Sequence, residues 1–477
     1  MGIKMEVTSY AFFLFFPIVV LTYYVIPKVL RQLWLLVVSY YFYMSWNVKY
    51  GIVLLTITII TYLGALALKW IDGCSAADRI KIRMKKSSIA VLALVIFGML
   101  SSCKYFIFVA GISFYSLQSF GYIMDVYHGK AETERNFLRY ALFLSFFPTV
   151  VSGPIERSTS FLRQLRYEDR TSFRMENIKQ GLCMMMWGYF LKLVVAERSA
   201  IFVNAVFDQN PGGVCVILAV LLYGMQIYCD FAGYSTLAVG AGRVLGFTLT
   251  ENFDAPYLSA TVSEFWRKWH RSLTGWFRDY LYIPLGGNRK GQVRKYINIM
   301  IVFVASGIWH GSGWKYLIWG GLNGSYQIVG EVLAPIRKKI ADGLRLGRIG
   351  KIHRILQVAG TYVLVDFAWL FFRANDTQSA LSMIKGAITE FRLSAIWDGS
   401  IYAYGLGQTE FHFLLVTILT VTVVDYLHYH RRYILELIKQ WHWTVRVSLC
   451  ACMFMSIIMF GVYGVNYDVG SFIYFTF

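Results

Sequence analysis

The sequence predicts an all-α protein that crosses a membrane many times. Hydrophobic residues make up 57% of its 477 residues, charged residues make up only 15%, and the mean hydropathy is +0.51. A soluble chain of this length would need more charged surface. The apolar residues also gather in continuous runs, which fit helices rather than a barrel because a helix satisfies its backbone polar groups within its own segment.

The apolar runs define the expected spans. Several are shorter than the ~20 residues that a straight span needs, so we expect about eleven true spans together with re-entrant and interfacial helices. The first run, Ser9–Ile26, has only Lys4 as a basic flank and no small-residue cleavage site, which predicts a retained span rather than a signal peptide. The runs cover residues 8–26, 31–46, 51–68, 88–102, 105–123, 137–152, 181–207, 214–229, 232–248, 296–310, 314–333, 356–372, 411–428 and 447–463.

Positive charge sets the expected orientation. The net charge is +19, and the positive-inside rule places the basic loops in the cytoplasm. This rule accounts for the charge without a nucleic-acid partner, although a basic cytoplasmic face also suits an anionic cofactor or anionic lipid head groups. No Lys or Arg follows Arg446, so the C-terminus is expected to be extracytoplasmic. The basic loops are 69–86, 155–179, 264–295, 334–354 and 430–446.

We therefore predict a transmembrane domain over residues 1–463 and an extracytoplasmic tail over residues 464–477. The seven cysteines form no CxxC pair and have no metal-ligand spacing, so neither a disulfide framework nor a metal site is expected. The sequence has no visible internal repeat. Many secondary transporters carry one, so this observation disfavours a transporter.

The densest polar and aromatic segment is Ser263–Gly291. Read as one helix, it places Trp266, Trp269 and His270 on an apolar face, and it places basic residues on the opposite face. That pattern predicts an interfacial helix lying along the membrane. It does not explain a histidine among tryptophans, so His270 is a candidate functional residue.

A second histidine, His310, lies between two apolar runs. An ionisable side chain at that depth is costly unless it is paired or lines a cavity, which makes it a candidate by default. A core histidine that is hydrogen-bonded for packing is the alternative. Small residues surround it and are expected to break the helix and open space for a slim substrate. They are Ser306, Gly307, Gly311, Ser312 and Gly313.

Six ordered motifs stand out between about residues 100 and 375. They are GISFYSLQSFGYIMDVYHGK, VVSGPIERSTSF, QIYCDFAGYSTLAVGAGRVLGF, FWRKWHRSLTGWFRDYLYIPLGGNR, SGIWHGSGWKYLIWGGLNG and FAWLFFRA. Together they resemble the membrane-bound O-acyltransferase family. The resemblance is greatest to the branch that acetylates bacterial alginate, peptidoglycan and other exopolysaccharides.

The resemblance implies that His270 and His310 are the two family histidines, with His310 assigned to catalysis. It also implies a tunnel through the membrane that meets near this histidine. The sequence departs from many relatives at Asn323, where they carry a histidine, and at Thr236, where they carry an acidic residue. Neither departure touches His270 or His310, but both leave the substrate open.

The implied activity is acyl transfer from a cytoplasmic thioester, with acetyl-CoA as the first expectation and no tightly bound cofactor. His310 is expected to act as general base, since an unperturbed imidazole has a pKa near ~6.5. The oxyanion donor is expected to be Asn323, Trp309 or a backbone amide near Gly311. His270 is expected to orient the donor or to shape the cytosolic mouth.

Several basic residues are candidates for binding the phosphates of coenzyme A, although the positive-inside rule explains each of them at least as well. These residues are Arg267, Lys268, Arg271, Arg289 and Lys290.

The chain ends in SFIYFTF, Ser471–Phe477. Its last six residues resemble the C-terminal motif of the small membrane partner in the teichoic acid D-alanylation system, where a terminal tyrosine is implicated as an acyl carrier. This resemblance implies that Tyr474 is the acyl acceptor and carrier. An aromatic anchor at the membrane interface is the alternative for the same residues.

The family implies a separate serine-dependent transferase of the SGNH type outside the cytoplasm, which would pass the acyl group to an envelope glycan. The expected location is the bacterial cytoplasmic membrane, with the lipid bilayer as surroundings. D-alanyl transfer to teichoic acid is an alternative reaction. A transporter or flippase of an envelope precursor, with both histidines lining its path, is the alternative from another functional class.

Overall fold

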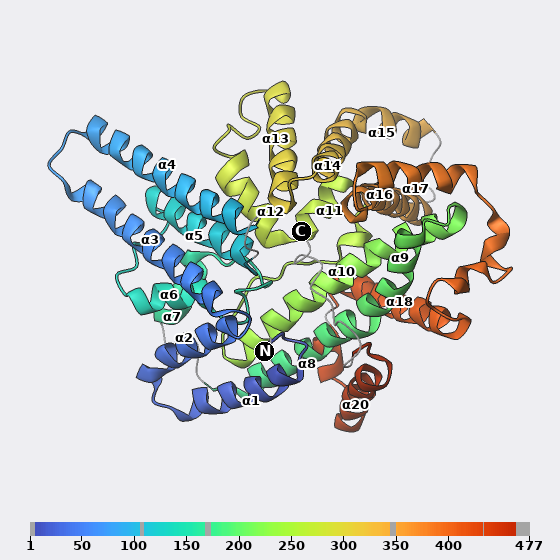
Figure 1. Ribbon diagram of the computed structural model, residues 1–477, viewed down its shortest axis with the longest axis horizontal. Helices are drawn as coiled ribbons and strands as arrows, with labels where there is room; N and C mark the ends of the chain where they lie inside the picture. Colours follow the sequence, from blue (N-terminus) through green and yellow to red (C-terminus); the bar gives the residue numbers. More distant parts are fainter. Residues whose placement is uncertain (1–4, 105–108, 167–172, 344–349, 433, 464–477) are drawn as a thin grey trace. The chain divides into compact units, whose positions relative to one another are not determined.

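The computed structural model describes residues 5–104, 109–166, 173–343, 350–432 and 434–463. Every regular element in these residues is a helix (Figure 1), which confirms the all-α prediction. The chain forms two compact units. Unit 1 contains Met1–Trp187 and Tyr234–Glu251, and unit 2 contains Gly188–Gly233 and Asn252–Phe477.

Unit 1 is built from the first helices of the chain and the second part of a long later one. Helices α3, α4 and α5 pack against one another (blue to cyan in Figure 1), and α2 packs against α6. Polar caps begin several of these helices, as where Asn47 accepts a hydrogen bond from the backbone of Lys49. The helices are α1 (Tyr10–Val25), α2 (Lys28–Met44), α3 (Val48–Gly73), α4 (Asp78–Ser102), α5 (Ile112–Tyr127), α6 (Phe137–Ser145), α7 (Ser158–Arg166), most of α8 (Met175–Tyr189) and the end of α10 (Gly213–Val244).

Unit 2 holds the segments that carry both candidate histidines. Helix α14 packs against α13, α16 and α11. The longer helices are α9 (Glu197–Gln209), the first part of α10, α13 (Gln292–His310), α14 (Trp314–Val332), α15 (Ala334–Gly343), α16 (Gly350–Arg373), α17 (Thr377–Thr389), α18 (Gln408–Tyr429) and α20 (Trp443–Phe460). The short helical segments are η3 (Phe190–Ala196), η4 (Pro256–Leu258), α11 (Val262–Lys268), α12 (Arg271–Phe277), η5 (Arg278–Tyr282), η7 (Leu393–Ile396), η8 (Ser400–Ala403) and α19 (Ile434–Lys439).

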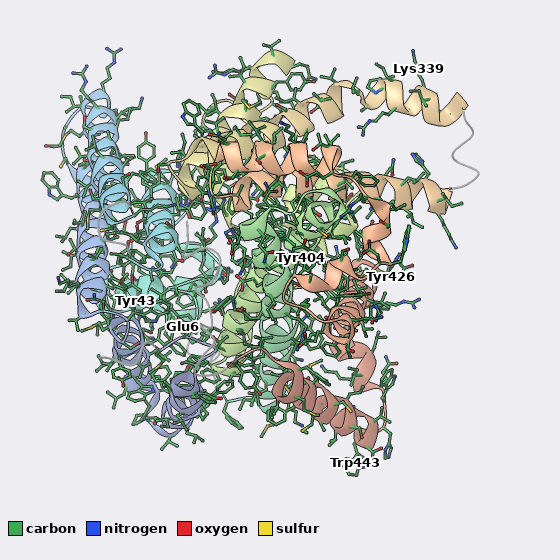
Figure 2. The ribbon with its side chains drawn as sticks, turned by 45° about the vertical axis from the view of Figure 1, so that its right-hand side comes forward. Glu6, Tyr43, Lys339, Tyr404, Tyr426 and Trp443 are labelled. Carbon is green, nitrogen blue, oxygen red and sulfur yellow. The ribbon has the colours of Figure 1, made fainter. Side chains whose placement is uncertain are left out.

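Within the described residues, six helices are long and apolar enough to cross a membrane: α3, α4, α10, α16, α18 and α20. The count of about eleven spans is not confirmed. The expected run 137–152 contains only the nine-residue α6, and the run 181–207 is interrupted by the π-helical segment η3. A multi-pass membrane protein is nevertheless supported. No residue in α20 is buried, and Trp443 at its start is exposed (Figure 2).

A buried charge cluster lies within unit 2. The ammonium group of Lys192 in η3 forms ion pairs with the carboxylates of Asp230 and Glu197, and all three side chains are almost fully buried. Buried charges are tolerated only when paired in this way, and removing one partner is strongly destabilising. The π-helical turns of η3 present Lys192 to Asp230 in α10. Phe231, the next residue of α10, contacts the ring of His270.

Unit 1 contains a buried carboxyl group in one of the resemblance motifs. Glu156, which is 3% exposed, accepts hydrogen bonds from the backbone N–H of Thr250 at 2.6 Å and from its hydroxyl at 3.2 Å. Its own backbone N–H donates to Gln118 Oε1 at 3.1 Å. Three segments that are distant in the sequence therefore meet at Glu156. Burial raises the pKa of this carboxyl group to about 7, while the bonds from Thr250 oppose the shift.

The raised pKa of Glu156 predicts a pH-dependent stability. The folded state keeps its proton up to about pH 7, whereas the carboxyl group of the unfolded chain ionises near pH 4.5. The stabilisation is therefore complete below about pH 4.5 and is lost as the pH rises through about 7. We expect the unfolding temperature of the wild type to fall relative to that of Glu156→Gln between pH 5 and pH 8, measured in detergent.

The matched control is Glu251→Gln, which changes an exposed carboxylate beside Thr250. It should leave the pH dependence of the wild type unchanged. A difference between wild type and Glu156→Gln that is constant across this pH range would contradict the assignment.

Candidate active site

The segment around His270 is two short helices rather than the single helix that the sequence predicts. Thr261 caps α11 by accepting a hydrogen bond from the backbone of Glu264, and α11 ends at Lys268. His270 then adopts a left-handed conformation with φ of 45°, and α12 begins at Arg271. The expected separation of aromatic and basic residues is nevertheless observed. The tryptophans are buried, and Arg267, Arg271 and Arg278 are exposed.

Asn252 holds the ring of His270. Its side-chain oxygen lies 3.3 Å from His270 Nδ1, and it accepts hydrogen bonds from the hydroxyl of Ser272 at 2.7 Å and from the backbone N–H of Ser272 at 3.3 Å. A backbone N–H can only donate, so the atom of Asn252 in this position must be its oxygen. His270 Nδ1 therefore carries the hydrogen, and Nε2 carries the lone pair.

Packing keeps this imidazole neutral. The ring of Phe231 stands perpendicular to it with centroids 4.6 Å apart, and His270 is only 2% exposed. Burial lowers the pKa of His270, which lies outside the candidate spans, to about 3. A neutral Nδ1–H tautomer in a left-handed backbone conformation is held by its surroundings, and such strained residues concentrate at functional sites.

His310 lies at the tip of a helical hairpin. Helix α13 ends at His310, and α14 begins after Gly311–Gly313, as the small residues around the histidine predict. The side chain is 4% exposed. Its ring contacts Trp319 and Phe372 edge-on, each at a centroid distance of 5.1 Å.

Glycines bring the two helices of this hairpin into backbone contact. A Cβ atom on Gly307 would lie 2.4 Å from the carbonyl oxygen of Tyr316, and one on Gly320 would lie 2.4 Å from that of Phe303. Any side chain at either position would force the helices apart. The close approach sets the distance between His310 on one helix and Trp319 on the other.

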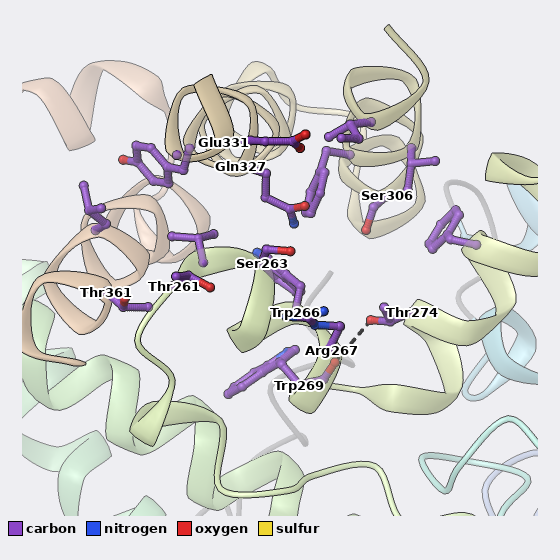
Figure 3. A pocket seen from close by; sticks show the side chains of 18 of the residues that line it. Thr261, Ser263, Trp266, Arg267, Trp269, Thr274, Ser306, Gln327, Glu331 and Thr361 are labelled. Carbon is purple, nitrogen blue, oxygen red and sulfur yellow. Dashed lines mark hydrogen bonds between the residues drawn. The ribbon is translucent and has the colours of Figure 1, made fainter. Parts of the chain in front are cut away.

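Both histidines line one cavity of about 770 Å³. Its buried end contains tryptophan rings, and its other end contains Gln327 and Glu331, which are half-buried and exposed, respectively (Figure 3). Lys295 forms an ion pair with Glu331, and Arg337, which also lines the cavity, donates a hydrogen bond to the carbonyl of the neighbouring Gly330. The cavity therefore joins a charged mouth to an apolar interior that holds two imidazoles.

The other predicted site residues take different places. Of the described residues, Arg267 lines the cavity, whereas Arg271, Arg289 and Trp309 do not. Trp309 is half-buried beside the ring of His310, with centroids 4.8 Å apart.

Asn323 is packed behind the cavity wall. Its oxygen accepts a hydrogen bond from Trp266 Nε1 at 3.0 Å, and its amide nitrogen donates to the carbonyl of Trp319 at 2.9 Å. Both ends of the Asn323 amide therefore bind tryptophans, and Asn323 is not among the described residues that line the cavity. Tyr474 lies outside the described residues.

Several residues at this site were not predicted. Asn252 stands in a polar segment, TENFDAP, where nothing in the sequence distinguishes it from its neighbours. Lys295 and Arg337 belong to basic loops that the positive-inside rule already explained, and Glu331 lies near the end of the apolar run 314–333. Only the fold shows that they surround the mouth of the cavity.

Comparison with known proteins shows the family of this chain. A family model described as MBOAT, membrane-bound O-acyltransferase family, matches residues 131–345, which include both histidines. The probable alginate O-acetylase AlgI of Pseudomonas putida is 34% identical over 404 residues, covering 80% of this chain and 79% of that protein. The chain belongs to the membrane-bound O-acyltransferase family.

Other members of the membrane-bound O-acyltransferase family are also similar. The peptidoglycan O-acetyltransferase of Helicobacter pylori is 30% identical and covers 79% of this chain and 78% of its own. The teichoic acid D-alanyltransferase of Streptococcus thermophilus is 30% identical over a shorter region, 48% of this chain and 58% of its own. Membership confirms the resemblance that the six motifs predicted and identifies the chain as an O-acyltransferase. The resemblance of the C-terminal tyrosine motif stays a prediction.

The glycine contacts generate a paired prediction. Gly320→Ala places a methyl group against the carbonyl of Phe303, so we expect it to destabilise the fold by about 1–3 kcal/mol and to lower acyl transfer. The adjacent Gly321→Ala meets no atom within 4 Å and gains up to about 1 kcal/mol of helix propensity. Thermal unfolding and transfer rates measured side by side should separate the two variants, and equal behaviour would contradict the role of the contact.

Asn252 generates a second prediction. Asn252→Asp keeps the accepting oxygen but adds negative charge beside His270, so the pKa of the imidazole should rise and the acid limb of the transfer-rate profile should move to higher pH. Asn252→Leu removes the acceptor and should lower the rate at every pH. Rates from pH 5 to 8 test both changes, with the exposed Asn204→Asp as control. An unmoved acid limb together with an active Asn252→Leu enzyme would show that Asn252 does not position the ring.

Proposed function

We propose that this protein takes an acetyl group from a cytoplasmic thioester donor and passes it across the membrane for O-acylation of an envelope polysaccharide or peptidoglycan. The observation that carries the proposal is the single cavity lined by both His270 and His310. Its charged mouth suits the phosphates of acetyl-CoA, and its apolar interior excludes water from the thioester. Arg267 was predicted to bind these phosphates, and it lines the cavity. Lys295 and Arg337 also line it, so they are better placed to bind the phosphates than Arg271 or Arg289, which do not.

His310 is the proposed general base. It takes the proton from an acceptor hydroxyl while the oxygen attacks the thioester carbonyl, forming a C–O bond. The tetrahedral intermediate then collapses, the C–S bond breaks, and the thiolate receives the proton. The neutral His270 carries a lone pair on Nε2. This nitrogen can accept a hydrogen bond from the acyl thioester and so orient the thioester in the cavity.

The proposed acceptor is the phenol of Tyr474. A phenol has a pKa near ~10, so its ester is more activated than an alkyl ester and can pass the acyl group onward. The absence of basic residues after Arg446 supports an extracytoplasmic position for this tail. An SGNH-type serine transferase outside the cytoplasm would then carry the acyl group from Tyr474 to the glycan.

Acetyl is favoured over D-alanyl by the extent of similarity. The acetylating relatives named above align over more than three quarters of this chain and of their own, whereas the D-alanyltransferase aligns over 48% of this chain. The cytoplasmic membrane of a bacterium is the proposed location. Family membership also favours the enzyme over the flippase alternative.

Covalent labelling tests the proposal. Purified protein in detergent is given acetyl-CoA that is radiolabelled in the acetyl group, and we expect a label that is released by hydroxylamine, as for a phenyl ester. Tyr474→Phe should abolish this label, while Tyr467→Phe, which changes another tyrosine of the same tail, should retain it.

His310→Ala should slow labelling by ~10²–10⁴-fold, the usual worth of a positioned base. The exposed His128→Ala is its control. Undiminished labelling of Tyr474→Phe would show that Tyr474 is not the acyl carrier. Undiminished labelling of His310→Ala would show that His310 is not the general base. If the folded wild type accepts D-alanyl groups but not acetyl groups, the acetyl donor is wrong and D-alanyl transfer is the reaction.

A further inference from the structure

Four tryptophans form a continuous wall at the buried end of the cavity. Trp266 and Trp269 come from α11 and its C-terminus, Trp319 comes from α14 and Trp369 comes from α16, and all four line the cavity. Three of them are at most 1% exposed, and Trp266 is 9% exposed. Ring centroids lie 5.5 Å apart for Trp266 and Trp319, 5.6 Å for Trp319 and Trp369, and 5.3 Å for Trp269 and Trp369.

The wall is braced from behind. Trp266 donates its indole N–H to Asn323, Phe265 stacks on Trp269 with centroids 5.3 Å apart, and Phe372 packs against Trp319 at 5.4 Å. The glycine contacts between α13 and α14 fix the backbone that carries Trp319. Close-packed aromatic rings held on three helical segments leave little freedom to retreat from a ligand.

The wall stands directly beside His310. The rings of His310 and Trp319 have centroids 5.1 Å apart, while Glu331 lies at the other end of the cavity (Figure 3). Lys295 forms an ion pair with Glu331, and Arg337 donates a hydrogen bond to the carbonyl of the neighbouring Gly330. A donor that places its anionic part at the mouth and its carbonyl carbon near His310 therefore directs its acyl chain towards the tryptophans. The space beyond the carbonyl is the part of the site that depends on acyl length.

We propose that this tryptophan wall sets the acyl length of the donor, so that the enzyme accepts acetyl groups and rejects acyl chains that are longer by two or more carbons. The inference rests on the proposed acyl transfer and assigns specificity to residues that take no part in the proton transfer. A hydrophobic pocket discriminates about 10–200-fold for one methylene. A rigid wall is expected to work in that range against butyryl thioesters.

Trp319→Phe is the variant that tests the wall. The change shortens the side chain of the wall that contacts His310, and the described residues hold no acceptor in hydrogen-bond reach of Trp319 Nε1, so phenylalanine removes no such bond. Its control is Trp276→Phe, which shrinks a buried tryptophan of unit 2 that is not among the described residues lining the cavity. Each variant counts as folded if its elution volume in size-exclusion chromatography and its unfolding temperature match those of the wild type.

The measurement is the ratio of labelling rates with butyryl-CoA and acetyl-CoA. We expect the wild-type ratio to be below about 0.1, Trp319→Phe to raise it about tenfold or more, and Trp276→Phe to leave it unchanged. A folded Trp319→Phe with the wild-type ratio would overturn the proposal, as would a wild type that uses butyryl-CoA as well as acetyl-CoA.

Failure of the proposed function is distinguishable from failure of the wall. A folded wild type that takes no label from any acyl-CoA would contradict the proposed function. The wall is then tested by binding of the unreactive thioethers S-ethyl-CoA and S-butyl-CoA. Trp319→Phe should improve the affinity for S-butyl-CoA relative to S-ethyl-CoA about tenfold, and an unchanged ratio of affinities would overturn the wall in this case too.

Discussion

The backbone contact between α13 and α14 is the constraint on which the site depends. Two helices that approach this closely need glycine on both faces, and Gly307 and Gly320 each lie against a carbonyl oxygen of the other helix. The hairpin turns at Gly311–Gly313 and leaves His310 at its tip. Its ring meets Trp319 because the absence of side chains at these two positions lets the helices approach this closely. The position of the candidate base His310 therefore depends on two glycines, which carry no side chain between the helices.

The second histidine is positioned by polar bonds. His270 interrupts what would otherwise be one amphipathic helix, and the left-handed residue costs conformational energy that its surroundings must repay. Asn252 supplies an oxygen shared by the imidazole and by Ser272, while Phe231 covers the ring. Phe231 follows Asp230, whose buried ion pair with Lys192 anchors that stretch of α10. Charge pairing in one part of unit 2 thus supports the geometry of a neutral ring in another.

The motifs that resemble the family do different physical work in the two units. In unit 1, Glu156 joins three distant segments through buried hydrogen bonds and lies far along the chain from either histidine. In unit 2, the motifs supply the imidazoles, the tryptophan wall and its braces. A motif residue is therefore not a site residue by default. Asn323 illustrates this, because the structure uses its amide to hold two tryptophans.

Composition and local pattern alone determined the class of the protein and drew attention to both histidines of its candidate site. Apolar runs predicted the helices, six motifs predicted the family, and two histidines in unfavourable surroundings predicted the residues that line one cavity. The count of about eleven spans did not follow, because run length and hydropathy do not show where a helix breaks, as at η3. The single helix expected through His270 was wrong for the same reason. A left-handed residue is stabilised by partners such as Asn252 and Phe231, which local periodicity does not reveal.

Only the tertiary structure decided which polar and aromatic residues act together. Lys295 and Arg337 resembled ordinary charges of basic loops, and Glu331 was one acidic residue at the end of an apolar run, until the fold placed all three at the same cavity. The four tryptophans lie as far as about a hundred residues apart in the sequence, and they become one surface only when α11, α14 and α16 pack. Residue type and spacing are local properties, and so they specify chemistry such as a base or an aromatic ring. The shape and depth of a cavity are set by contacts between distant segments, and no local pattern encodes them.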